Sequence, residues 1–392
     1  YKILFAIVFT IRNFNNNNDS EPIKLSHSSS LSKGEGRGEE NIKWKRYKPF
    51  KNYPKMKTSI LKNIENDFLS SEHLSFDSIQ HALKQEFDTV LIASKNGYKN
   101  ILNANAWGDH LHNLTVEELF IMNLNDKEVL AILNLSIYQA IIQNDYSHLI
   151  NGVFTYSRLR LLQRTHVSGT KDWIVVESMI TNDKILKNLE YPKSITFNKD
   201  KSYDEVIVLA ENLLKTIVTN PAFKMDAQKQ YSELIGNVSS KFDNSFINYL
   251  YGLTTDNYEL CKTSFEQMEQ LYGRCQWLSR GWYEDAKLNT KGPIFLLGLY
   301  RLKNVSIANF EFDIKNEFLK KASNFIIENP EYKPSLCMSF NNELQFLNNI
   351  LTENFATFYT NYQTKINAIK TAVKKPEIKK KFRFFNFRSK SN

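Results

Sequence analysis

Turn-forming residues are scarce in this chain of 392 residues. Residues 58–373 contain ten glycines and five prolines, far fewer than a sheet-rich fold of that length needs for its turns. Segments that alternate apolar and polar residues, as half-buried strands do, are almost missing too. These absences exclude a sheet-rich fold. They predict an all-α protein of antiparallel helical hairpins, stacked as an α-α array or as an irregular bundle.

Cysteine and long apolar runs are also rare. The three cysteines, Cys261, Cys275 and Cys337, form no C-x-x-C pair, and an odd number cannot all pair within one chain. We expect them to be small core residues in a reducing compartment. No apolar run reaches the roughly 18 residues of a transmembrane helix, and the longest near the N-terminus lacks a signal-peptide cleavage site. The sequence therefore predicts a cytoplasmic protein.

Positive charge is confined to two short segments. The net charge is +9, but residues 42–57 carry seven basic groups and no acidic one, and residues 374–392 carry eight basic groups and one acidic one. Residues 58–373 therefore have a net charge of −5. The C-terminal segment also contains four phenylalanines, a pattern that suits an anionic membrane surface or nucleic acid. We favour a basic, disordered, solubilising tail and do not expect nucleic-acid binding.

The first 55 residues differ in composition from the rest. They contain an asparagine run and the string SHSSSLSKGEGRGEE, and the first methionine is Met56. Such a segment has too few large apolar groups to offset the entropy lost on ordering. We expect residues 1–55 to be a disordered leader outside the native protein. The helical domain would then span residues 56–373, either as one body or as two lobes, 56–190 and 200–373.

Apolar periodicity and capping signals predict the individual helices. Thr115 and Glu118 have the Thr-x-x-Glu order of a capping box, and Gly97 can end the preceding helix in the left-handed conformation. Asp126 is expected to cap the next helix, and Pro376 to end the last one. Outside the central segment, the predicted helices cover residues 59–69, 76–96, 115–124, 126–142, 146–164, 172–190, 204–219, 226–238, 314–327 and 342–373.

Residues 243–303 are predicted to be the segment around which the chain is organised. They contain two amphipathic helices and a third helix that begins at Pro293. Only Thr255, Asp256 and Asn257 separate the first two helices, so they must pack antiparallel. The apolar residues predicted to meet between them are Phe246, Leu250, Leu253, Cys261, Phe265, Met268 and Tyr272.

An earlier pair of helices resembles this central hairpin. The two sequences superpose when Asn144-Asp145 is matched with Asp256-Asn257, and a small residue, Ala140 or Gly252, then occupies the same place in each. The spacing of 112 residues is too long for a tandem helical repeat. Either an internal duplication or chance similarity between two helical hairpins explains it.

One short motif has residue types that bind metals. Asp109, His110 and His112 offer a carboxylate and two imidazoles, ligands that suit zinc or iron. A two-residue spacing brings two histidines to one side only in a strand, and no third ligand can be assigned. We favour a loop at a helix boundary with Trp107 packed inward. The chain has no nucleophile elbow or phosphate-binding loop, and we expect no cofactor and no catalytic residue.

The joint after the central hairpin is rich in tryptophan and arginine. Arg274, Trp277, Arg280, Trp282 and Tyr283 lie within ten residues, and these residue types dominate binding hot spots. We take them as the candidate residues for binding a protein partner. The alternative, which we favour for the tryptophans, is that Trp277 and Trp282 close the core while the arginines stack outside.

Three strings between residues 130 and 303 carry a resemblance to a known family: INYLYGLTTDNYELCKTSFEQM, GRCQWLSRGWYEDAK and FLLGLYRL. In these the chain resembles the helical immunity proteins that bacteria encode beside polymorphic toxins, of the Imm49-like group. The resemblance implies a protein that docks on a toxin and occludes its active site in a stoichiometric complex. It assigns no individual functional residue. The acidic domain would complement the basic substrate groove of a nuclease toxin.

These observations predict a non-catalytic protein-binding protein, most specifically an immunity protein that neutralises a cognate toxin by stoichiometric binding. Two alternatives from other classes stay open. One is a helical-repeat scaffold or a membrane-associated adaptor that uses the basic aromatic tail. The other is a divergent metal-dependent enzyme that uses Asp109, His110 and His112.

Overall fold

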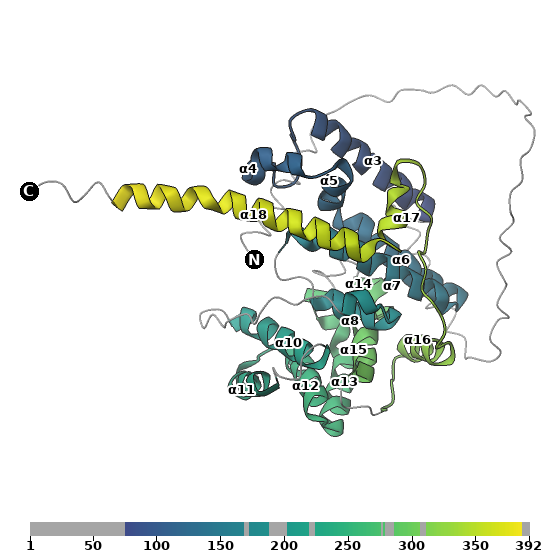
Figure 1. Ribbon diagram of the computed structural model, residues 1–392. Coiled ribbons are helices and arrows are strands. Elements are labelled where there is room, and N and C mark those ends of the chain that lie inside the picture. Colours follow the sequence, from purple (N-terminus) through teal and green to yellow (C-terminus); the bar gives the residue numbers. More distant parts are fainter. Residues whose placement is uncertain are drawn as a thin grey trace, which may run out of the picture. The chain divides into compact units, whose positions relative to one another are not determined.

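The computed structural model describes residues 75–167, 172–187, 202–218, 224–275, 277–278, 286–305 and 311–385. They belong to one unit, Lys55–Asn392. The described residues form helices, turns and irregular segments without a strand, which confirms the all-α fold (Figure 1). The predicted leader and the predicted helix at residues 59–69 lie outside the described residues.

The helices fall into two groups along the chain. The first group is α3 (Phe76–Lys95), α4 (Ala104–Trp107), η1 (Gly108–Asn113), α5 (Val116–Asn123), α6 (Asp126–Gln143), α7 (Tyr146–Gln163), η2 (Arg164–His166), α8 (Asp172–Thr181) and α9 (Lys184–Lys187). The second group is α10 (Ser202–Val218), α11 (Lys224–Leu234), η4 (Ile235–Asn237), α12 (Lys241–Thr255), α13 (Tyr258–Leu271), η5 (Tyr272–Arg274), α14 (Ala286–Lys291), α15 (Ile294–Leu302), η7 (Lys303–Val305), α16 (Glu317–Glu328), η8 (Asn342–Leu344), α17 (Phe346–Ile350) and α18 (Phe355–Phe385).

The predicted capping signals are present where the sequence places them. The Thr115 side chain accepts from the Glu118 backbone N–H at 3.3 Å, and the Glu118 carboxylate accepts from the Thr115 N–H at 2.8 Å. Gly97 follows α3 with a φ of +72°, a conformation that costs glycine little. Asp126 is not a cap, contrary to the prediction. Asn125 caps α6 by accepting from Lys127 N–H, which frees the Asp126 carboxylate for other bonds.

The two helical hairpins turn in the same way. Asn144 after α6 and Asp256 after α12 both adopt the left-handed conformation, with φ of 52° and 57°. In each hairpin the next residue, Asp145 or Asn257, caps the returning helix with its side chain. The predicted match between the two segments is therefore a match of backbone geometry, because asparagine and aspartate tolerate positive φ and also cap helices.

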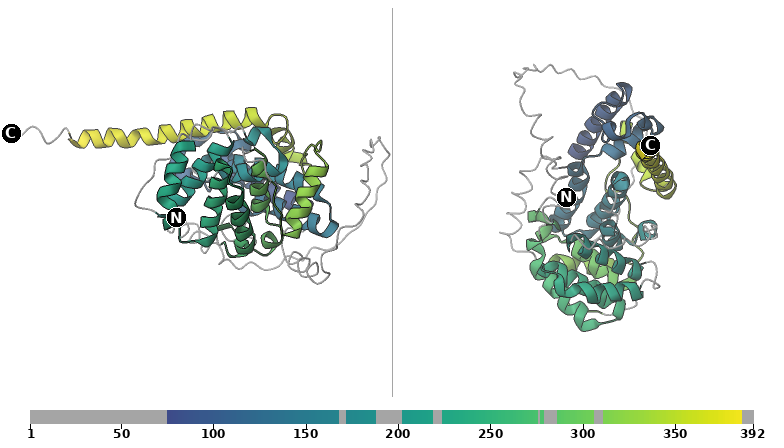
Figure 2. Two further views of the ribbon diagram at one scale, coloured as in Figure 1. Left: turned by 90° about the horizontal axis from the view of Figure 1, so that it is seen from below. Right: turned by 90° about the vertical axis from the view of Figure 1, so that its left-hand side faces the viewer.

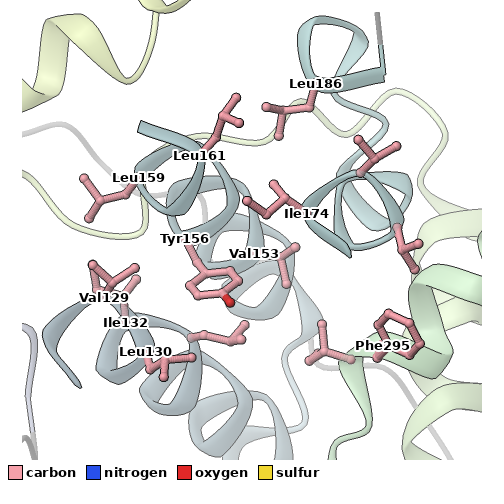
Figure 3. Packing of buried hydrophobic residues seen from close by; sticks show 14 of the residues in the cluster. Val129, Leu130, Ile132, Val153, Tyr156, Leu159, Leu161, Ile174, Leu186 and Phe295 are labelled. Atoms are coloured by element: carbon pink, nitrogen blue, oxygen red, sulfur yellow. The ribbon is translucent and has the colours of Figure 1, made fainter. Parts of the chain in front are cut away.

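The structure is centred on α7 and not on the segment of residues 243–303, so that prediction is wrong. Every residue from Gly152 to Gln163 is buried, and α7 contacts α5, α6, α8 and α16. Figure 3 shows Val153, Tyr156 and Leu159 packed with side chains of α6 and α8. A helix enclosed on all sides must satisfy its polar side chains through bonds to its neighbours.

Helix α8 connects α7 to the second group of helices. It packs on α7 and on α15, and an added Cβ atom at Gly298 of α15 would lie 2.3 Å from the Val176 carbonyl oxygen of α8. Helix α15 packs in turn on α12, where the Tyr249 hydroxyl donates to the Leu299 carbonyl at 2.8 Å. One cluster of buried residues extends from Ile79 to Ile369, so residues from both predicted lobes share one core.

Two predicted long helices are interrupted. The helix expected at residues 172–190 stops at Thr181, where Asn182 has a φ of 55° and the Asp183 side chain caps α9. The helix expected at residues 342–373 is divided into η8, α17 and α18, with a turn at residues 351–354. The apolar periodicity continues across both interruptions, which is why the sequence predicts single helices.

The last helix is longer than predicted. Helix α18 runs through Pro376 to Phe385 as one helix (Figure 2), so the prediction that Pro376 ends it is wrong, and residues 374–385 of the predicted disordered tail are helical. Lysines and a glutamate, which have favourable helix propensities, surround the proline. Towards its start, α18 is tied to α5, since Lys365 Nζ donates to the Glu118 carboxylate at 2.8 Å.

The three cysteines are free thiols, as expected. Burial raises the pKa of each of them to about 12, so they pack as neutral side chains. None of the described helices combines the length and the apolar character required of a bilayer-spanning segment.

Candidate functional site

The predicted partner-binding residues are only partly described, and those that are described play different roles. Arg274 ends η5 and is exposed. Trp277 is half-buried, and its indole N–H donates to the Asp243 carboxylate at 2.9 Å. Its ring packs 5.5 Å from that of Trp173 and 5.7 Å from that of Phe295. Trp277 therefore stabilises the joint between α12 and α15. Arg280, Trp282 and Tyr283 lie outside the described residues.

The candidate metal motif lies in the 3₁₀ helix η1. Asp109, His110 and His112 occupy this helix, and Trp107 just before it is buried, as the loop interpretation predicts. Within the part of the chain that the structure describes, no group of three or more metal-ligating side chains comes together. Within these residues, the fold brings no further ligand to the motif.

A network of buried polar groups lies at the C-terminal end of α7. The Asp126 carboxylate accepts from the guanidinium groups of Arg160 and Arg164 and from the Gln163 amide. The Arg160 side chain is 1% exposed, whereas those of Arg164 and Asp126 are 22% and 34% exposed, so the network extends from the core to the surface. The nearby His166 imidazole is buried, which lowers its pKa to about 4. These bonds fix α7 against the start of α6.

Another candidate site is a cleft beside α16, which we call the α16 cleft. It encloses about 400 Å³ between α7, α8, α15 with η7, α16 and the segment that follows α16. Ile180 and Met179 form part of its buried floor, while Ile327 and Val305 at its rim are 56% and 38% exposed. A volume of this size accommodates a few side chains of a partner.

Arg301 is the one charged residue that lines the α16 cleft within the described ranges of the chain. Its two terminal nitrogens donate to the Asn304 side-chain oxygen, at 3.2 and 3.1 Å, once that amide is oriented to accept from them. Its Nε–H is buried and has no hydrogen-bond partner. Burial lowers the pKa of Arg301, because desolvation disfavours the charged form. Among the described residues, no carboxylate forms an ion pair with this guanidinium.

A second, shallower cleft lies against the same helix. It encloses about 340 Å³, and its lining includes the acidic residues Glu311 and Asp313 together with Lys320. Ile327 lines both clefts, so its exposed side chain forms the ridge between them. Helix α16 therefore presents one apolar side chain between a cationic cleft and a mixed-charge cleft.

The sequence interpretation missed the α16 cleft. One signal was present, because Arg301 is the only charged residue of the otherwise apolar helix α15. Its apolar neighbours are used in the core, which leaves the guanidinium at the end of the helix facing the cleft. The other walls come from α7 and α8, more than a hundred residues before Arg301, and from α16 and the segment after it, so no local pattern reveals the cleft.

Comparison of the chain with protein-family models, with curated proteins and with solved structures finds no match.

Proposed function

We propose that this protein acts by binding another protein, as a cytoplasmic immunity protein that neutralises a toxin in a stoichiometric complex. The observation that carries the proposal is the α16 cleft, in which Ile327 and Val305 are exposed beside the guanidinium of Arg301. Protein interfaces are built around such a combination, an apolar anchor and an arginine that becomes desolvated when the partner docks.

Hydrogen bonds hold the walls of the α16 cleft in place, which supports this proposal. A binding surface is most effective when its side chains are already held in place, because less entropy is then lost on association. Helix α16 is held at its start by the Glu269 carboxylate of α13, which accepts from Asn316 N–H at 2.9 Å. The segment after it is held by Asn151 of α7, which accepts from the Tyr332 hydroxyl at 3.0 Å.

Two features of the sequence favour an immunity protein over other kinds of protein-binding protein. The helical hairpin and joint resemble those of helical immunity proteins, and residues 58–373 carry a net charge of −5. A negatively charged inhibitor associates faster with a basic enzyme, because long-range attraction increases the encounter rate.

The test is co-expression with the product of the neighbouring gene. We expect that product alone to stop cell growth, this protein to restore it, and the purified pair to form a 1:1 complex. Ile327→Asp should weaken binding by at least about thirtyfold, the effect of losing a central anchor. Ile92→Asp is the matched control, because Ile92 is 60% exposed on α3 and lines neither cleft.

Growth inhibition that this protein does not relieve would contradict the immunity function. Equal binding by the Ile327→Asp and Ile92→Asp variants would show that the partner docks elsewhere, and the exposed Arg274 would then be the next residue to test.

A further inference from the structure

The α16 cleft contains a guanidinium, that of Arg301, which forms no ion pair with a carboxylate of the described residues. We infer that the α16 cleft binds a carboxylate of the partner protein, from an aspartate or glutamate flanked by aliphatic side chains, through Arg301. This inference rests on the proposed function, and it specifies the chemistry of the segment that the partner presents.

The hydrogen bonding of Arg301 favours a carboxylate as its ligand. A guanidinium has five N–H donors arranged to bind a carboxylate with two parallel bonds. Here the Asn304 oxygen is the acceptor that faces the terminal nitrogens, and Nε–H remains buried without one. An incoming carboxylate would meet the two terminal N–H groups, where charge-assisted bonds replace bonds to a neutral amide oxygen and are stronger than those bonds.

The Glu311 carboxylate, which lies near Arg301, forms its hydrogen bonds with other residues. The Glu311 carboxylate already accepts from Lys303 Nζ at 2.5 Å and from the Tyr300 hydroxyl at 2.9 Å. Lys303 is only 1% exposed, so moving Glu311 away would leave a buried ammonium group without its ion pair. Glu311 also attracts Arg301, but its hydrogen bonds go to Lys303 and Tyr300, so the terminal donors of Arg301 remain available to a carboxylate of a partner.

The charge and the apolar wall of the α16 cleft favour a carboxylate over a phosphate. A phosphate monoester carries about −1.5 to −2 charges and three acceptor oxygens, and its sites combine several donors. Among the described residues, a single cationic group lines the α16 cleft, and aliphatic side chains such as Ile326 and Ile327 form its wall. One positive charge matches one carboxylate, and the apolar wall matches the aliphatic neighbours of that carboxylate.

The experiment uses two short capped peptides, Leu-Asp-Leu and Leu-Asn-Leu, which differ by one charge. The full chain carries ¹³C-labelled isoleucine methyl groups. Resonances of Ile327 report on the cleft, and that of the equally exposed Ile92 serves as the internal reference. We expect the aspartate peptide to shift the Ile327 resonance at concentrations about tenfold lower than the asparagine peptide, the typical effect of a charge-assisted hydrogen bond.

Substitutions then assign the effect to one residue. Arg301→Gln should abolish the difference between the peptides, whereas Lys320→Gln, in the neighbouring cleft, should preserve it. Equal effects of both peptides on the wild-type chain, or none at Ile327, would overturn the inference, and so would tighter binding of inorganic phosphate. A concentration-dependent shift of Ile327 without peptide would identify a second copy of the chain as the occupant and overturn it too.

This measurement does not depend on the toxin. If the neighbouring gene product is not bound, the proposed function fails whatever the peptides do. If that product binds the wild-type protein and the Arg301→Gln variant equally well, the inference fails while the proposed function stands.

Discussion

The guanidinium of Arg158 and the carboxylate of Asp183 form a buried ion pair, with 2.7 Å between Nε and Oδ2. The same guanidinium donates from Nη1 to the carbonyl oxygens of Leu351 and Thr352, at 2.7 and 3.1 Å. Asp183 follows the interruption between α8 and α9, and Leu351 and Thr352 lie in the interruption between α17 and α18. One side chain of α7 therefore stabilises both breaks in the predicted helices.

Loss of this arginine should be among the most damaging single changes in the protein. Arg158→Met leaves the Asp183 carboxylate and two carbonyl oxygens buried without their donor, at a cost of about 3–5 kcal/mol in the free energy of unfolding. Urea denaturation measures it, and Lys84→Met is the control because Lys84 and Asp88 form a partly exposed pair. Similar losses in both variants would disprove the special role of Arg158.

The close approach of α8 and α15 predicts a large effect of a single methyl group. Gly298→Ala would place Cβ 2.3 Å from the Val176 carbonyl oxygen, so the two helices must separate, at a cost of about 1–3 kcal/mol or more. Gly236→Ala is the control, since nothing lies within 4 Å of the added atom. Thermal melting compares the two variants. Equal melting temperatures for the Gly298→Ala and Gly236→Ala variants would contradict this packing.

The third prediction concerns the left-handed residue at the turn of each hairpin. Asp256 has a φ of 57°, where a β-branched residue is strained, so Asp256→Val should lower the stability by about 1–2 kcal/mol. Asp256→Gly relieves the same strain and should leave the stability unchanged or slightly higher. At Asn144, the valine variant should likewise be less stable than the glycine variant. Chemical denaturation measures the stability of all four variants. A valine tolerated at either position would show that the turn geometry differs there.

The fourth prediction concerns pH. Burial and the nearby Glu128 carboxylate raise the pKa of Glu86 to about 8, well above its ordinary value of 4.5. Between these two pH values the folded state holds a proton that the unfolded state has released. The free energy of unfolding therefore falls as pH rises from about 4.5 to about 8, and it changes no further from this source above pH 8.

Glu86→Gln removes this titration. We expect the variant to be more stable than the wild type above pH 8, by on the order of 3 kcal/mol, and the difference to shrink towards pH 4.5. Guanidinium denaturation across this range measures it, with Glu331→Gln at an exposed position as the control. A constant offset between Glu86→Gln and the wild type at all pH values would contradict the raised pKa.

Features with a local cause were predictable from the sequence. The Thr115 capping box, the stop at Gly97 and the antiparallel packing of α12 on α13 all follow from residues close together in the chain. Their side-chain hydrogen bonds and apolar stripes form within one or two turns of helix, so the sequence pattern contains the necessary information.

Features set by distant contacts were not predictable. The breaks at Asn182 and at residues 351–354 are accompanied by bonds from Arg158, which lies 193 residues before Leu351. The central position of α7 was missed for the same reason, because its buried polar residues look like those of a solvated helix until their partners are known. Arg301 was missed because the walls of its cleft come from four separate parts of the chain.

The carbonyl partners of Arg158 also constrain the order of events during protein synthesis. Asp183 leaves the ribosome soon after α7, but Leu351 and Thr352 leave it much later, so the guanidinium lacks its carbonyl partners while most of the chain is translated. Helix α7 then becomes fully enclosed only when α17 and α18 dock, and a nascent chain that stalls before them would expose its central helix to proteases and chaperones.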